Sequence, residues 1–317
     1  PMYVRLVTLP VNVVLNALLV FGLGPFPSLG VVGAAVGTAV AYLLSAGAFL
    51  ALLLTARFPV RLRLGGPQVD LPLMGEIARV GLPLAGTRLS RTFGRFPFLF
   101  VLGVLGTSEL AAYAVGRRVV LFAMMPAWGY STAASTLVGQ AVGGGDDEAA
   151  TSYGWQTTRI ALATQLLVAA VIAAFAPSIA RGFGTEDVAL TATFVRVFAL
   201  GVAGFSVSRT MRGALRGAGD TRWPFYGTVV GTYLVRLPVA FLALPVGYAV
   251  TLGPFRIAGV PFGPFSAAPG MGFGVAAAFA AILAGLYVKA VVNTARFASG
   301  RWVAVARSAR GATPGDD

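Results

Sequence analysis

The chain has 317 residues, of which 57% are apolar and only 11% charged, and its mean hydropathy is +0.80. This composition excludes a disordered chain, a collagen and a disulfide scaffold, and it is typical of a polytopic membrane protein. Without cysteine or histidine, thiol catalysis, histidine acid–base chemistry and the usual zinc sites are excluded, and we expect no metal site. The net charge of +13 suits loops that meet anionic lipid head groups, so we expect the bilayer as partner and not nucleic acid.

Apolar windows long enough to cross a bilayer occur eight times, which predicts an all-α membrane protein with eight transmembrane helices. The predicted spans are residues 2–23, 29–54, 80–105, 111–138, 157–181, 188–211, 224–247 and 271–296. Short breaks rich in Gly, Pro and Arg separate them, and residues 248–270 read as an extended loop.

Arginines gather in alternate predicted loops, which predicts how the chain is oriented in the membrane. One set of loops holds Arg57, Arg61, Arg63, Arg212, Arg216, Arg222, Arg296, Arg301, Arg307 and Arg310. We expect this set in the cytoplasm, with a cytoplasmic C-terminus. Arginine dominates, with Lys289 as the only lysine, and we attribute this imbalance to coding bias without functional content.

The first two spans resemble the last two. Residues 29–35 read LGVVGAA and residues 271–277 read MGFGVAA, and the two segments end alike at residues 55–58 and 294–297. Paired halves are common in transporters. Four helices precede the second copy and none precedes the first, so we expect the chain to be a C-terminal piece of a twelve-helix protein, with the four missing N-terminal helices as its partner.

Four stretches resemble the multidrug and toxic compound extrusion (MATE) transporters, in their DinF-like branch. These are residues 12–22 with 29–35, residues 81–83, residues 109–113 with 133–140, and residues 212–221. The resemblance implies two six-helix lobes and eight helices that correspond to helices 5–12 of twelve. It divides the chain into the last two N-lobe helices (1–58), a cytoplasmic linker (59–76), a six-helix C-lobe (77–300) and a cytoplasmic tail (301–317).

All eleven acidic residues fall in predicted loops or at helix ends, although a buried ion relay normally needs a carboxylate. The DinF-like branch carries an Asn and, four residues later, an Asp on its fifth helix; Asn12 matches and Asn16 departs. The resemblance adds Thr38 to this remnant of a cation site. Asn cannot take up a proton near neutral pH, and the two amides can also simply bridge helices.

Arg88, Arg91 and Arg95 form one stripe of a predicted helix, and Arg236 lies centrally in another span. Charges at that depth should face a water-filled cavity or a partner. We expect a basic cavity wall that binds anionic or polar groups; snorkelling toward head groups is the alternative. Met124 and Met125 suit a promiscuous apolar pocket or ordinary packing.

The resemblance implies a secondary active exporter of small, amphipathic organic compounds in the plasma membrane, working by alternating access. H⁺ or Na⁺ would be the coupling ion, and no cofactor is expected. The closest alternative is a flippase for lipids or lipid-linked oligosaccharides. A membrane-embedded lipid-modifying enzyme is disfavoured, because the residues that such chemistry needs are lacking.

Overall fold

The computed structural model describes residues 2–55, 71–253, 255–257, 260–262 and 265–311. The chain divides into two compact units, residues 1–74 and 75–317. The predicted linker, residues 59–76, lies mostly outside the described residues.

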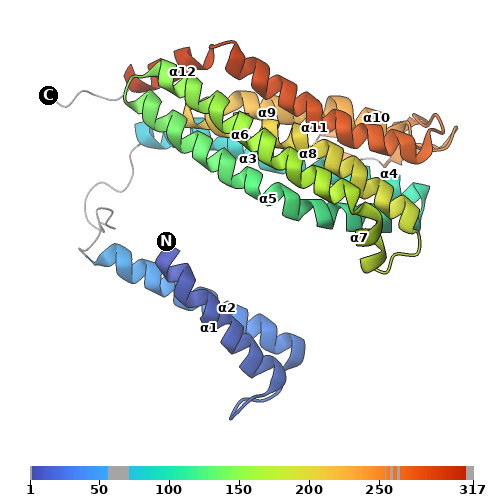
Figure 1. Ribbon diagram of the computed structural model, residues 1–317, viewed down its shortest axis with the longest axis horizontal. Coiled ribbons are helices and arrows are strands. Elements are labelled where there is room, and N and C mark those ends of the chain that lie inside the picture. The colour runs from blue at the N-terminus through green and yellow to red at the C-terminus, as the bar shows by residue number, and fades with distance from the viewer. Residues whose placement is uncertain (1, 56–70, 254, 258–259, 263–264, 312–317) are drawn as a thin grey trace. The chain divides into compact units, whose positions relative to one another are not determined.

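Two antiparallel helices make up the described part of the first unit (Figure 1). They are α1 (Met2–Phe21) and α2 (Gly30–Leu54). Glycines allow the two helices to approach closely: a Cβ atom added at Gly33 would collide with the carbonyl oxygen of Leu19, and one added at Gly37 would collide with Asn16 Oδ1.

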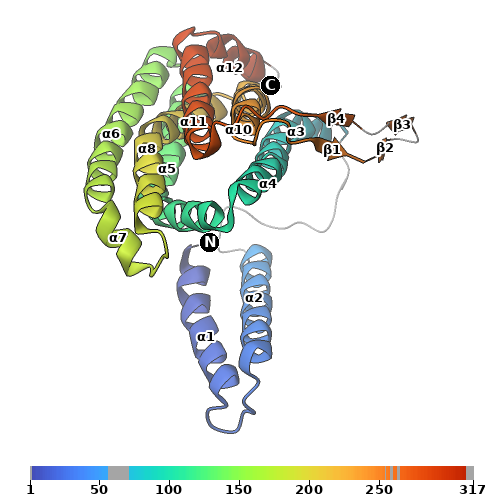
Figure 2. The ribbon, with the colours of Figure 1, turned by 90° about the vertical axis from the view of Figure 1, so that its right-hand side faces the viewer.

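A helical bundle forms the second unit, in which α5, α6, α8 and α11 are the long helices (Figures 1 and 2). In chain order its elements, from α3 onward, are α3 (Leu71–Phe93), α4 (Arg95–Leu105), α5 (Thr107–Gly143), α6 (Asp147–Ala174), α7 (Ala176–Gly182), α8 (Val188–Gly217), α9 (Arg222–Val229), the π-helix η1 (Val230–Arg236), α10 (Leu237–Phe241), β1 (Val250–Leu252), β2 (Phe255–Ile257), β3 (Val260–Phe262), β4 (Phe265–Ala267), α11 (Gly274–Ala298) and α12 (Trp302–Gly311).

Each predicted span is helical over most of its length, and the predicted all-α membrane fold is confirmed. Three spans are divided into segments: at Gly94, at Phe175 and by the π-helix η1. Pro97 and Pro177 follow the first two breaks closely, and a proline displaces the carbonyl four residues before it. Six described helices, α1, α2, α5, α6, α8 and α11, are long and apolar enough on their own to cross a bilayer.

The extended loop predicted at residues 248–270 contains strands instead. β1 pairs with β4 in an antiparallel ladder that sets Val250 opposite Ala267, and β2 pairs with β3, with Phe255 opposite Phe262. This ribbon projects from the end of the bundle (Figure 2). Nested antiparallel pairing satisfies backbone groups that an open loop would leave to solvent.

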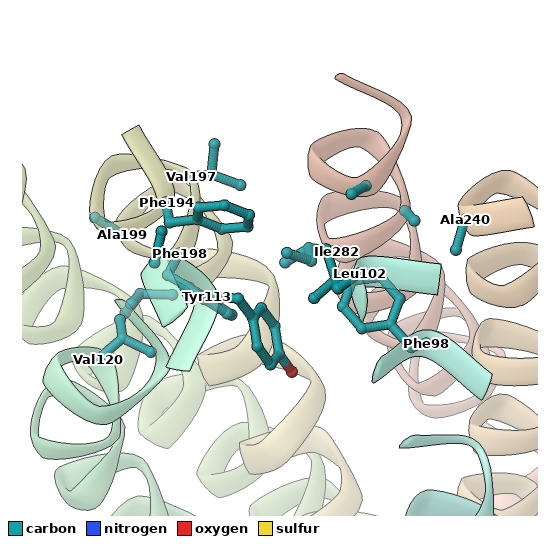
Figure 3. Packing of buried hydrophobic residues seen from close by; sticks show 14 of the residues in the cluster. Phe98, Leu102, Tyr113, Val120, Phe194, Val197, Phe198, Ala199, Ala240 and Ile282 are labelled. Atoms are coloured by element: carbon teal, nitrogen blue, oxygen red, sulfur yellow. The ribbon is translucent and has the colours of Figure 1, made fainter. Parts of the chain in front are cut away.

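An aromatic core joins the helices of the second unit. Tyr113 of α5 packs with its ring centroid 5.4 Å from Phe98 of α4 and 5.5 Å from Phe198 of α8. Figure 3 shows Tyr113 between the residues of α8 on one side and Leu102, Phe98 and Ile282 on the other. This packing fixes α4, α5, α8 and α11 around a common centre.

Helix α12 packs at the end of the bundle that lies opposite the β-ribbon (Figure 1). Trp302 is completely buried, stacks on Phe297 of α11 with ring centroids 5.2 Å apart, and donates its indole N–H to the Phe297 carbonyl oxygen at 3.0 Å. Arg307 of α12 bonds Asp147, at the start of α6, at 2.8 Å. The loops after α5, α8 and α11 therefore gather at one end, and its cytoplasmic location stays a prediction.

Candidate functional site

A cavity of about 210 Å³ lies inside the second unit, bounded by α3, α4, α5, α8, η1 and α11. Its lining residues are Arg91, Arg95, Tyr113, Arg117, Val120, Leu121, Met124, Trp128, Phe198, Phe205, Ser208, Arg212, Thr232, Arg236, Ile282, Gly285, Leu286 and Lys289. The lining combines many positive charges with aromatic and aliphatic side chains.

Six different elements supply its positive charges, one each. The six cations are Arg91 at the end of α3, Arg95 at the start of α4, Arg117 of α5, Arg212 of α8, Arg236 of η1 and Lys289 of α11. No acidic side chain is among the lining residues. The two salt bridges found among the described residues, Asp220–Arg296 and Asp147–Arg307, involve none of these cations.

Glycines hold two of the cations against each other's helices. A Cβ atom added at Gly231 of η1 would lie 2.6 Å from Lys289 Cγ, and one added at Gly285 of α11 would lie 2.9 Å from Arg236 Cβ. Each element thus provides one cation and the glycine that accommodates the other's aliphatic stem. We call these two contacts, Gly231 with Lys289 and Gly285 with Arg236, the cation–glycine pair.

Arg236 has a second support in the aromatic core. Its guanidinium carbon lies 4.0 Å from the centroid of the Phe98 ring, within the range of a cation–π contact. Its Nε atom, and that of Arg212, are buried and have no hydrogen-bond partner among the described residues. Two buried guanidinium donors therefore lack a protein acceptor in the described structure.

The rest of the lining is largely apolar. Val120, Leu121, Met124 and Trp128 line the cavity from α5, at a spacing that places them on one helical face. Phe198 and Phe205 of α8 and Ile282 and Leu286 of α11 are further apolar lining residues, so the three helices that carry Arg117, Arg212 and Lys289 also supply the apolar contacts. The site can therefore receive a molecule with one charged and one apolar part.

The residues predicted for the cavity separate into two groups. Arg91, Arg95, Arg236 and Met124 line it, and Arg88 and Met125 are not among the lining residues. Arg88 is exposed, and Met125 is 49% exposed. Contact of any of them with a substrate stays a prediction.

Sequence reasoning missed half of the cations. Arg212 was predicted to be in a loop, which is wrong: α8 continues to Gly217 and carries Arg212 into the cavity. Lys289, attributed to coding bias, and Arg117 also line the cavity. The available signal was a charge inside an apolar span, which applied to Lys289 as well as to Arg236.

The predicted cation-site remnant lies in the first unit. Asn16 Nδ2 donates to Asn12 Oδ1 at 3.1 Å, and Asn16 Oδ1 is buried without a hydrogen-bond partner among the described residues. The bond runs within α1 and does not bridge α1 to α2. Thr38 follows Gly37, which faces Asn16, but no hydrogen bond joins Thr38 to either asparagine in the described structure. The role of the three residues in ion binding stays a prediction.

A family model described as MatE matches residues 83–242, half of the chain. The chain belongs to the MATE family. It is 32% identical over 244 residues to a probable multidrug resistance protein NorM of Thermotoga maritima, covering 76% of this chain and 52% of that protein. It is 30% identical over 282 residues to a probable NorM of Bradyrhizobium diazoefficiens, covering 82% of this chain and 59% of that protein.

A crystal structure of a MATE protein in a bent conformation has the same fold. It matches with a TM-score of 0.77 and 21% sequence identity, over 97% of this chain and 62% of that one. The chain spans about half the length of the curated relatives it matches. Membership of a transporter family agrees with the expectation that the chain is not an enzyme.

The matched range contains most of this MATE chain's cavity. Five of the six cations, all except Lys289, fall within residues 83–242. The family match therefore covers the cavity-lining residues of every helix except α11.

Proposed function

We propose that this chain works as part of a secondary active exporter of small organic compounds, in its DinF-like form, in the cell membrane. The supporting observation is the charged and partly apolar cavity enclosed by helices of a MATE family member. Transport would follow alternating access, as one lobe rocks against the other.

The cost of charge at membrane depth supports a transport role. An ionised side chain in a spanning helix is expensive unless it faces water or a partner. Lys289 lies well inside α11, and Arg236 lies within the continuous helical stretch from Arg222 to Phe241. Both line the cavity and have no carboxylate partner among the described residues. A cavity that water and solute can enter would account for this placement.

We propose that the polar cluster Asn12, Asn16 and Thr38 binds the coupling ion. The free Oδ1 of Asn16 supplies an oxygen that can bind a cation or accept a hydrogen bond. Since an amide does not ionise near neutral pH, this cluster alone favours Na⁺ over H⁺; a carboxylate at position 16 would restore a titratable group.

The test is export from proteoliposomes by the full-length gene product that contains this sequence. An organic dye is loaded, and H⁺ or Na⁺ gradients are imposed separately. We expect an inward gradient of one ion to drive export, and Asn16→Asp to increase the dependence on H⁺. Export that neither gradient alters would overturn the proposal.

A flippase for lipids or lipid-linked oligosaccharides is the second candidate, favoured by the six cations that suit a phosphate-bearing head group. Passage of a lipid-linked substrate across the bilayer without any gradient, together with no dye export, would favour it. The lipid-modifying enzyme remains disfavoured.

A further inference from the structure

We propose that the cavity of the second unit binds a compact amphipathic organic anion with a phosphate group, and that it rejects organic cations. This inference deepens the proposed function, on which it rests for the ligand to be a transported substrate. Binding itself follows from the geometry of this unit alone.

Charge is the first argument. Six cations line about 210 Å³ and no acidic side chain lines it with them. Like charges held close together in a site of reduced dielectric repel one another, and an incoming organic cation adds to that repulsion. A group with two negative charges relieves more of it than a single carboxylate does.

The second argument is how firmly the donors are positioned. The cation–glycine pair fixes the stems of Arg236 and Lys289, and Phe98 supports the Arg236 guanidinium at 4.0 Å. Arg212 reaches the same cavity from α8 with a buried Nε that no described residue accepts. Guanidinium groups bind phosphate oxygens in a two-pronged geometry, and preorganised donors lose little freedom on binding.

The apolar lining residues define the rest of the ligand. Met124 and Trp128 of α5 and Phe205 of α8 lie in the same lining as the cations. A phosphate held by the cations would leave an attached aromatic or short alkyl body in contact with these apolar side chains. The volume lies below the several hundred Å³ of ordinary drug sites, so the body is compact.

The experiment is calorimetric titration of the full-length protein in neutral phosphatidylcholine nanodiscs. The probes are 1-naphthyl phosphate and 1-naphthylmethyl(trimethyl)ammonium, which share an aromatic body and differ in charge. We expect the phosphate to bind and the ammonium not to bind. We also expect added NaCl to weaken phosphate binding, because salt screens partly exposed charges.

Matched variants connect binding to these residues. Arg212→Gln and Lys289→Met should each weaken naphthyl phosphate binding about tenfold or more, as expected for a lost charge-assisted hydrogen bond. Arg117→Gln should weaken it as well, and its neighbour Arg118→Gln should not, because Arg118 is exposed and absent from the lining. Arg212→Lys, which keeps the charge, should recover most of the loss and so separates ligand binding from misfolding.

Two further probes identify the source of the phosphate. Competition by phosphatidic acid in the nanodisc supports a lipid head group, and displacement by inorganic phosphate without lipid competition supports a soluble phosphate compound. Ammonium binding as tight as phosphate binding, or equal losses in Arg117→Gln and Arg118→Gln, would overturn the inference. Phosphate binding without gradient-driven export would instead overturn only the proposed function.

Discussion

The ion pair between Asp220 and Arg296 lies at the α12 end of the bundle. It is the more buried of the two salt bridges among the described residues. Arg296 Nε lies 2.7 Å from Asp220 Oδ2, and the two side chains are 11% and 3% exposed. Arg296 also lies over the Trp223 ring, 5.0 Å from its centroid. The pair ties the turn after α8 to the end of α11.

Asp220→Asn should therefore destabilise the protein by about 3 kcal/mol, because it leaves a buried guanidinium without its charge partner. The readout is the melting temperature in detergent. Arg307→Gln is the control: Arg307 is 69% exposed, and an exposed pair contributes at most about 1 kcal/mol. Equal melting temperatures for the two variants would contradict this role of Asp220.

Some cavity residues could be predicted from the sequence and others could not. The stripe containing Arg91 and Arg95 was visible because helical periodicity relates residues of one predicted span, although the break at Gly94 places Arg91 in α3 and Arg95 in α4. Arg212 and Lys289 come from helices far apart in the chain, and no spacing relates them. Arg212 was also misplaced because a positive charge at the end of an apolar window resembles a loop arginine, whereas here the helix continues to Gly217.

At the scale of elements, α5 and α8 pack through backbone contact. A Cβ atom added at Gly213 would collide with the Ser131 carbonyl oxygen, and one at Gly217 with that of Ser135. The small residues at 131–136 therefore permit a close approach of the two helices.

Gly213→Ala should separate the two helices and destabilise the protein by about 1–3 kcal/mol, the usual cost of overpacking. The control is Gly129→Ala on α5, where an added Cβ meets no atom within 4 Å. There alanine should stabilise the helix slightly, by at most about 1 kcal/mol. Thermal unfolding in detergent should show shifts of opposite sign; a stabilised Gly213→Ala would refute the close contact.

The presence of the spanning helices was predictable, because the length of an apolar segment determines whether it can span a bilayer. The internal breaks were not predicted. Pro97 and Pro177 mark two of them in the sequence, whereas the π-helix η1 coincides with the packing of Gly231 against Lys289. The strands at residues 250–267 escaped prediction because their Gly and Pro content is typical of loops.

For the whole molecule, the predicted repeat has a counterpart in backbone geometry. The second helix of each copy begins at a glycine with positive φ, 52° at Gly30 and 54° at Gly274. In both copies glycines also bring the two helices into close contact, through Gly33 and Gly37 in one and through Gly231 and Gly285 in the other. The similar entry turns support the internal repeat inferred from sequence, whereas the contact glycines differ: both lie on α2 in the first copy, and one lies on each helix in the second.

Membrane orientation is the prediction that concerns every span together, and it can be measured by cysteine labelling because these 317 residues contain no cysteine. Single cysteines are introduced at three exposed positions, Ser28, Glu186 and Ser308, and labelled with a membrane-impermeant maleimide. Ser28→Cys and Glu186→Cys should react in intact cells, because positive charges hold the opposite loops in the cytoplasm.

Ser308→Cys should react only after the cells are permeabilised, because α12 carries the arginine-rich end of the chain. The three variants together test the orientation and whether the number of intervening spans is even or odd: an even number must separate Ser28 from Glu186, and an odd number must separate Glu186 from Ser308. Labelling of Ser308→Cys in intact cells would contradict the predicted orientation. Labelling of Ser28→Cys and Glu186→Cys on different sides would instead contradict the predicted count of spans between them.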